Sequence, residues 1–269
     1  MGEEEVIHAG GPVTRARLAA DLCDLGVVPG STVMVHSSLS RLGWVAGGAQ
    51  AVVLALLDAV GADGTLVVPT HSGHLSDPAR WERPPVPEEW WPAIRRETPA
   101  FDPLLTPTRN MGAVVECFRH LPDASRSYHP IYSVAAVGAH RDRIVEGHAL
   151  AHGLGEQSPL ARLYDLDAWV LLLGVGHANN TSLHLAEYRA DYPAKAWTTR
   201  ASPVTVDGER RWVEWPDLDG DTTDFVALGA DFAATGMEIN GPVGGGTGRL
   251  MRQREVVDFA VAWMGSHRR

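Results

Sequence analysis

An uninterrupted apolar segment at residues 168–174 is the strongest strand signal in this chain of 269 residues. Strands that are covered on both faces carry such runs, so this strand is expected inside a sheet. Shorter β-branched strands are predicted at residues 32–36 and 65–69, and each follows a segment with helical spacing of its apolar residues, 14–25 and 49–60. This alternation predicts an α/β fold, in which a parallel or mixed sheet carries helices on its faces.

The rest of the chain continues this pattern with one long interruption. Residues 71–109 carry recurring prolines and no period, which is typical of a lid, a binding loop or an insertion. Helices are predicted at 110–121, 139–146, 183–190 and 249–264, a strand at 134–138, a polar hairpin at 200–215 and a flexible glycine connector at 241–248. No segment has the composition of a linker, so residues 1–269 are predicted to form one domain.

The chain is acidic, with 33 acidic and 23 basic side chains and a formal net charge of −10. Nucleic-acid backbones and anionic bilayers bind clustered lysine and arginine, so no nucleic acid and no membrane is expected as the main partner. A cationic small molecule suits the charge better.

Cysteine usage and the N-terminal segment indicate the compartment. The two cysteines, Cys23 and Cys117, lie in helix-like segments and exclude a disulfide framework, which favours a reducing compartment. Residues 1–11 are rich in glutamate and lack the apolar core of a signal peptide. No segment approaches the roughly 18 apolar residues of a membrane span. A cytoplasmic location is therefore expected.

Two strand ends carry residues suited to chemistry, because ligands of α/β sheets bind beyond the carboxyl ends of the strands. The first is His36-Ser37-Ser38-Leu39, whose hydroxyls and backbone N–H groups suit a phosphate or a pantetheine amide. A serine-rich turn without a ligand is the alternative interpretation.

The second strand end runs from Gly174 to Glu187. His177 follows a glycine turn and is expected at the rim, where an imidazole can accept a proton near neutral pH. His184 and Glu187 lie three residues apart on the next helix and share a face, so the carboxylate can fix the tautomer of a histidine. The alternatives are a loop histidine at 177 and a packing histidine at 184.

Other chemical motifs are incomplete. His148 and His152 have the spacing of a helical metal-binding pair, but the glutamate of the zinc-protease motif is missing. The glycines of 241–248 lack the Lys-Ser/Thr of a phosphate-binding loop, and no G-x-S-x-G nucleophile elbow occurs. No metal site is therefore predicted.

Six segments in register resemble the aminoglycoside 3-N-acetyltransferase family, and together they extend over about residues 14–264. They are residues 36–39, 64–70, 108–112, 126–130, 158–161 and 171–187. The resemblance implies a three-layer α/β/α sandwich with a central mixed, largely parallel sheet, unlike the GNAT acetyltransferase fold. It also implies acetyl-CoA as donor and direct transfer to the 3-amino group of an aminoglycoside antibiotic, which confers resistance.

The resemblance further implies roles for single residues. His177 matches the catalytic histidine and is the expected general base, while Glu187 matches an acidic position of the active site. The positions expected to bind the coenzyme are His36, Ser37, Ser38, Leu39, Thr70, Met111 and Gly112. Whether Glu187 orients a histidine or pairs with a substrate ammonium stays open.

A polycationic acceptor favours a wall of carboxylates, for which Asp102, Glu187 and Asp224 are the candidates. Solvated surface charges are the alternative for Asp102 and Asp224. Trp90 is expected to stack on a sugar ring if residues 71–109 form a lid, although an insertion on the outside is equally compatible. An acetyltransferase for another amine metabolite and a non-catalytic binder of cationic sugars are alternative functions. Monomer and homodimer both stay open.

Overall fold

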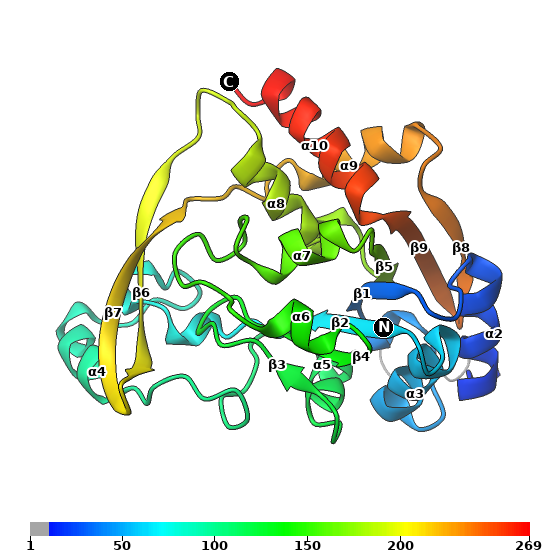
Figure 1. Cartoon of the computed structure of the whole chain (residues 1–269), viewed down its shortest axis with the longest axis horizontal. Helices are drawn as coiled ribbons and strands as arrows, with labels where there is room; N and C mark the ends of the chain where they lie inside the picture. Colours follow the sequence, from blue (N-terminus) through cyan, green and yellow to red (C-terminus); the bar gives the residue numbers. More distant parts are fainter. Residues whose placement is uncertain (1–10) are drawn as a thin grey trace.

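The computed structural model describes residues 11–269, in which seven strands form the main sheet (Figure 1). In chain order they are β1 (Thr32–Ser37), β2 (Thr65–Pro69), β3 (Ser125–Arg126), β4 (Val134–Gly138), β5 (Trp169–Leu173), β8 (Ile239–Val243) and β9 (Gly246–Arg252). Their order in the sheet is β3-β4-β2-β1-β5-β9-β8. β1 pairs in parallel with β2 and β5, and the other neighbours pair antiparallel. The mixed sheet is confirmed, but parallel pairing is limited to the three inner strands instead of prevailing throughout.

Helices cover both faces of this sheet. One face carries α2 (Arg15–Leu25), α3 (Gly48–Val60) and α5 (Ala113–Arg119), and the other carries α6 (Arg141–Val145), α7 (Pro159–Asp165), α8 (Ser182–Arg189), α9 (Phe225–Ala234) and α10 (Gln253–His267). Side chains alternate along a strand, so Val33 and Val35 of β1 pack against α2 and α3, while Met34 packs in the core formed with α8 and α10. The three-layer sandwich is therefore confirmed.

Local signals explain where several elements begin and end. The Thr14 side chain caps α2 by accepting a hydrogen bond from the backbone N–H of Arg17, and Gly26 ends the helix with a φ of 113°. The apolar run at 168–174 forms β5, whose Leu172 is fully buried, between β1 and β9. The strand expected inside the sheet is indeed an inner strand.

A separate two-stranded sheet, β6 (Trp197–Val206) and β7 (Glu209–Leu218), extends the hairpin predicted at 200–215. Within residues 71–109 the structure has short 3₁₀ turns, η2 (Gly73–Leu75), η3 (Pro78–Arg80) and η4 (Glu88–Trp90), followed by helix α4 (Trp91–Glu97). Arg210 of β7 donates hydrogen bonds to the carbonyls of Arg95 and Thr98, so α4 lies beside the hairpin (Figure 1). This segment is more regular than its prolines suggested.

The glycine-rich segment 241–248 forms the end of β8, a tight turn at Gly244 and Gly245, and the start of β9, which corrects the expectation of a flexible connector. Gly244 has a φ of 61°, and a Cβ at this position would lie 2.8 Å from the carbonyl oxygen of Leu42. Only glycine tolerates both conditions. β9 continues to Arg252, so α10 begins at Gln253 and not at residue 249.

Both cysteines are free thiols, Cys23 exposed and Cys117 half-buried. No helix within residues 11–269 combines the length and the apolarity that a bilayer span requires. Residues 1–10, which contain most of the N-terminal segment used to predict the compartment, lie outside the described residues.

Candidate active site

A cavity of about 220 Å³ lies where the carboxyl ends of β1, β2 and β5 meet at one edge of the sheet. The residues that line it include His36, Ser37, His71, His184 and Phe225. A larger groove of about 840 Å³ adjoins this cavity, because Val175 and Asn179 line both. The cavity is therefore located where the topology of an α/β sheet favours a ligand site.

His184 and Glu187 form a hydrogen-bonded pair on α8. His184 Nδ1 lies 2.5 Å from Glu187 Oε2, and the carboxylate is fully buried. Burial alone would raise the pKa of Glu187, but hydrogen bonds from His184, Arg268 and the backbone of Asp221 hold it below its ordinary value. An ionised carboxylate only accepts, so His184 donates from Nδ1, and in the neutral form of the ring Nε2 then carries the lone pair. This Nε2 makes no hydrogen bond within residues 11–269, and the ring lines the cavity.

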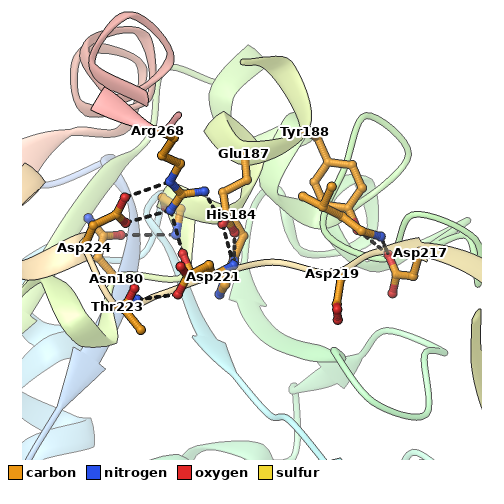
Figure 2. A network of polar contacts seen from close by, with 12 residues as sticks. Asn180, His184, Glu187, Tyr188, Asp217, Asp219, Asp221, Thr223, Asp224 and Arg268 are labelled. Atoms are coloured by element: carbon orange, nitrogen blue, oxygen red, sulfur yellow. Dashed lines mark hydrogen bonds and ion pairs between the residues drawn. The ribbon is translucent and has the colours of Figure 1, made fainter. Parts of the chain in front are cut away.

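The surroundings of Glu187 hold its carboxylate in one position. Its Oε1 accepts hydrogen bonds from the backbone N–H of Asp221 at 2.9 Å and from Arg268 Nη1 at 2.7 Å. Gly220 passes so close that a Cβ would lie 2.8 Å from Glu187 Oε2. Figure 2 shows Arg268 between Glu187 and Asp224. The carboxylate that orients the histidine is therefore itself held on several sides.

His177 lies in the 3₁₀ turn η5 (His177–Asn179) after β5, but it lines neither the cavity nor the groove. Its Nε2 lies 2.6 Å from Glu238 Oε2, and its Nδ1 is buried without a hydrogen-bond partner among the described residues. Gly229 of α9 packs on the ring so closely that a Cβ would lie 2.2 Å from His177 Cγ. The expectation that His177 is presented at the rim is corrected, because α9 covers the ring and Glu238 occupies its Nε2.

Glu238, which no motif singled out, is 61 residues away from His177 in sequence. Its Oε1 accepts hydrogen bonds from Asn240 at 2.9 Å and from Arg249 Nη1 at 2.7 Å. Burial would raise the pKa of Glu238, but the hydrogen bonds from His177, Asn240 and Arg249 lower it to about 2. His177 is thus part of a hydrogen-bond network around a buried carboxylate.

Most residues expected to bind the coenzyme reach the cavity or the groove. His36, Ser37 and Met111 line the cavity, and Ser38 lines the groove. Gly112, with a φ of 85°, follows Met111 and precedes α5.

Leu39 and Thr70 do not line either space, and coenzyme binding at these two positions stays a prediction. Leu39 begins the turn η1 (Leu39–Arg41) and packs against the apolar core. Thr70 is fully buried, and its hydroxyl donates to Ser133 Oγ at 3.1 Å and accepts from Arg126 Nε at 3.1 Å. Both side chains are already occupied by contacts within the fold.

Two imidazoles that line the cavity carry a buried nitrogen without a partner among the described residues, His36 Nε2 and His71 Nε2. Burial, with a smaller contribution from His184, lowers the pKa of each ring to about 3, so both are neutral near pH 7. Buried polar atoms are rarely left unpaired, and a polar group of a ligand would satisfy these two. The cavity therefore fits a ligand with hydrogen-bonding groups, such as the thioester end of a coenzyme.

The groove carries three arginines that no motif singled out, Arg17, Arg41 and Arg249. Arg249 pairs with Glu238, and Arg17 lies 3.7 Å from Asp21. The side chain of Arg41 makes no hydrogen bond or ion pair within the part of the chain that the structure describes. Guanidinium groups beside glycine-rich backbone suit a phosphate.

The acceptor residues expected besides Glu187 do not line the cavity or the groove. Asp102 Oδ1 accepts hydrogen bonds from the backbone of the turn that follows it, and Trp90 is 55% exposed in η4. Asp224 is paired with Arg268 through both carboxylate oxygens. Residues 217–224 hold four aspartates and pass beside Glu187. This density of aspartate was the sequence signal that could have located the acidic segment next to the His184–Glu187 pair.

Comparisons with known proteins agree with one another. A family profile for aminoglycoside 3-N-acetyltransferase matches residues 34–265. The chain is 47% identical to the SPbeta prophage-derived aminoglycoside N(3')-acetyltransferase-like protein YokD of Bacillus subtilis (strain 168), over 94% of this chain and 92% of the relative. It is 41% identical, with the same two coverages, to aminoglycoside N(3)-acetyltransferase VII of Streptomyces paromomycinus.

Solved structures show the same relationship. The crystal structure of the B. subtilis YokD protein matches with a TM-score of 0.95 at 44% identity, over 98% of each chain. AAC-IIIb in a binary complex with CoASH matches with a TM-score of 0.84 at 31% identity, over 94% of this chain and 97% of that one. AAC-VIa bound to sisomicin matches with a TM-score of 0.87 at 31% identity, over 96% and 100%. The chain belongs to the aminoglycoside 3-N-acetyltransferase family.

Proposed function

We propose that the protein transfers the acetyl group of acetyl-CoA to the 3-amino group of an aminoglycoside, with His184 as general base and Glu187 as the residue that orients it. The observation that carries this proposal is that His184 lines the cavity with its Nε2 unbonded among residues 11–269, while its Nδ1 is held by a buried carboxylate. The AAC-IIIb complex with CoASH and the AAC-VIa complex with sisomicin support the two substrates. Glu187 is too deeply buried to serve the acceptor directly.

Proton transfer is the step for which the histidine is needed. An amine attacks a thioester carbonyl through its lone pair, which the protonated ammonium form lacks. The acceptor nitrogen must therefore be deprotonated, and it loses a further proton when the amide forms. His184 Nε2 takes this proton as the N–C bond forms, and the imidazolium that results is stabilised by Glu187. The C–S bond then breaks, and the coenzyme sulfur leaves as a thiol after receiving the proton from His184.

The groove and the cavity divide the coenzyme between them. Its phosphates suit the groove, where the side chain of Arg41 has no partner among the described residues and Arg17 and Arg249 add positive charge. Its thioester end suits the cavity beyond Val175 and Asn179, close to His184. Because acetyl-CoA is a cytoplasmic metabolite, the proposal also places the activity in the cytoplasm, where acetylation of the antibiotic would confer resistance.

The test is acetylation of a mixed aminoglycoside panel, with thiol release and mass spectrometry of the products as readouts. We expect His184→Ala to lower kcat by about 10²–10⁴-fold while it still binds CoA. The matched variant His177→Ala is expected to keep kcat within about tenfold of the original protein, because its ring does not line the cavity. Full activity of His184→Ala would remove His184 from the reaction.

A second acceptor class is favoured by one observation. A cavity of about 360 Å³ shares His71, Asn110 and Met111 with the inner cavity, and its lining has three arginines and one carboxylate, Glu82. Such a lining suits an amine that also carries a carboxylate or phosphate. Turnover of such amines, with none of the aminoglycosides, would favour this alternative amine acetyltransferase.

A further inference from the structure

Arg268 directly follows α10 and is placed beside the His184–Glu187 pair (Figure 2). Its side chain is 8% exposed. It donates hydrogen bonds to Glu187 Oε1 at 2.7 Å, to both carboxylate oxygens of Asp224 at 2.7 Å and to the carbonyl oxygen of Asp221 at 2.6 Å. Burial would lower the pKa of Arg268, but the ion pairs with Asp224 and Glu187 outweigh it and raise the pKa. The guanidinium is therefore permanently charged and held in one position.

The charges around His184 come from every element that packs near its ring. The titratable groups are His36 on β1, His71 after β2, Glu187 on α8, Tyr192 and Lys195 after α8, Asp221 and Asp224 before α9, and Arg268 after α10. α9 itself contributes the uncharged ring of Phe225. His36 and His71 are neutral near pH 7, because burial lowers the pKa of each to about 3. Arg268 is thus the cation that pairs directly with Glu187, whereas the ammonium of Lys195 bonds the carbonyl oxygens of Tyr188 and Ala190.

Glu187 would act differently on His184 without this arginine. An unopposed carboxylate next to an imidazole stabilises the protonated ring, which cannot accept a proton from the acceptor amine. A carboxylate that shares its charge with a guanidinium still accepts the hydrogen bond from Nδ1 but attracts the proton less strongly. The bidentate contact to Asp224 also fixes the plane of the guanidinium group. The position of Arg268 Nη1, which donates to Glu187 Oε1, is therefore fixed as well.

We propose that Arg268 is a positioning residue of the transferase: it holds Glu187 in the orientation that His184 needs, and its charge offsets part of the negative charge of Glu187 beside the imidazole. This inference rests on the proposed role of His184 as general base. Arg268 itself contacts neither substrate, since it lines neither the cavity nor the groove.

The test is the dependence of kcat on pH, measured with both substrates saturating. Arg268→Gln is expected to move the acidic limb of the profile to higher pH by about 0.5–1 unit and to lower kcat near pH 7 by roughly 3–10-fold, with partial recovery at higher pH. Asp224→Asn removes a negative charge and leaves Arg268 in place, so the limb is expected to move the other way, to lower pH. Arg268→Lys keeps the charge, so the acidic limb of its profile should lie between those of Arg268→Gln and the original protein.

Arg189→Gln is the matched control. Arg189 lies on the same helix as His184 and pairs with Glu156 at 2.7 Å, outside the network in Figure 2. Arg189→Gln removes a partly buried arginine and changes the net charge by the same amount as Arg268→Gln. The acidic limb of its kcat–pH profile is expected to stay where it is in the original protein. KM for acetyl-CoA should stay unchanged in Arg268→Gln, because the arginine does not line the groove.

The inference is overturned if folded Arg268→Gln retains the original profile, or if Arg268→Gln and Asp224→Asn shift the limb in the same direction. Should Arg268→Gln fail to fold, Asp224→Asn decides, and an unchanged or upward-shifted limb contradicts the inference. Activity in His184→Ala would instead remove the proposed general base. An inactive His184→Ala together with unshifted profiles would remove the role of Arg268 alone.

Discussion

Residues 11–269 contain two assemblies in which a histidine bonds a buried glutamate that is also paired with an arginine. The α8 assembly is His184, Glu187 and Arg268, and the covered assembly is His177, Glu238 and Arg249. Both carboxylates are fully buried. The assemblies differ at the second ring nitrogen: the ring of His184 lines a cavity, whereas Nδ1 of His177 is buried in the protein.

This difference shows that having a histidine, a glutamate and an arginine in contact is not enough to make the histidine a general base. A histidine acts on a substrate only if a lone pair is accessible to it, and access depends on the elements that pack around the ring. At His177 access is removed by α9, whose Gly229 lies against the imidazole. At His184 the same helix contributes Phe225 to the cavity wall and leaves Nε2 open.

Replacing the glutamate of each assembly by glutamine should give the largest contrast. Glu187→Gln leaves an amide that no longer stabilises the imidazolium, so kcat is expected to fall by about 10²-fold or more. Glu238→Gln is expected to change kcat by less than about threefold, because His177 does not line the cavity. Steady-state kinetics of both variants check this, and a larger loss in Glu238→Gln would reverse the comparison.

Packing of α9 on the covered assembly should appear in stability. A Cβ at Gly229 would overlap the His177 ring, so Gly229→Ala is expected to lower the free energy of unfolding by about 2–3 kcal/mol. Gly265→Ala is the control, because Gly265 lies in α10 and its Cβ would have room, 3.4 Å from the nearest atom. There the expected change is a small gain. Urea unfolding measures both, and equal values would mean that the His177 ring is not held by α9.

The covered assembly should also contribute to the pH dependence of the free energy of unfolding, with a smaller effect than that of Gly229→Ala. The pKa of Glu238 is lowered from an ordinary 4.5 to about 2 in the folded protein. The stability from such a group is present above the unfolded value and is lost as pH falls through the folded value. The free energy of unfolding should therefore decrease between about pH 4.5 and 2, and Glu238→Gln should reduce that decrease by roughly 1–2 kcal/mol. Glu187, whose pKa is also lowered, contributes with the same sign, so an unaltered slope in Glu238→Gln would assign the effect to other groups.

Most of the layered fold could be predicted because its signals are local. The apolar run at 168–174, the β-branched segments and the caps of α2 each depend on a few neighbouring residues, and β1, β2, β4 and β5 appear where strands were expected. The short β3 was not predicted, and β8 and β9 occupy segments that were expected to be a connector and the start of a helix. The direction of β4 could not be predicted in this way, since its antiparallel pairing with β2 depends on how residues 71–133 return to the sheet.

The candidate site could be predicted in its location but not in its assignment of the base. The position of His177 after a buried strand is a local signal, and it led to the rim of the sheet. Its partner Glu238 is 61 residues away, and Gly229 contacts it only because α9 folds over the strand end. His184 and Glu187 share one helix, so their pairing was visible, but which histidine stayed accessible depended on tertiary packing.

The arginines of the two assemblies should give the smallest and most specific contrast. Arg249 lines the groove proposed for the coenzyme, whereas Arg268 does not. Arg249→Gln is therefore expected to raise KM for acetyl-CoA by about 3–10-fold, with a weaker dependence on salt and little change in kcat. Glu238 keeps its hydrogen bonds from His177 and Asn240 in this variant, so the fold should persist. Initial rates at several acetyl-CoA and salt concentrations measure the effect. An unchanged KM would mean that the phosphates of the coenzyme bind elsewhere. Only the shape of the groove would then support coenzyme binding at this place.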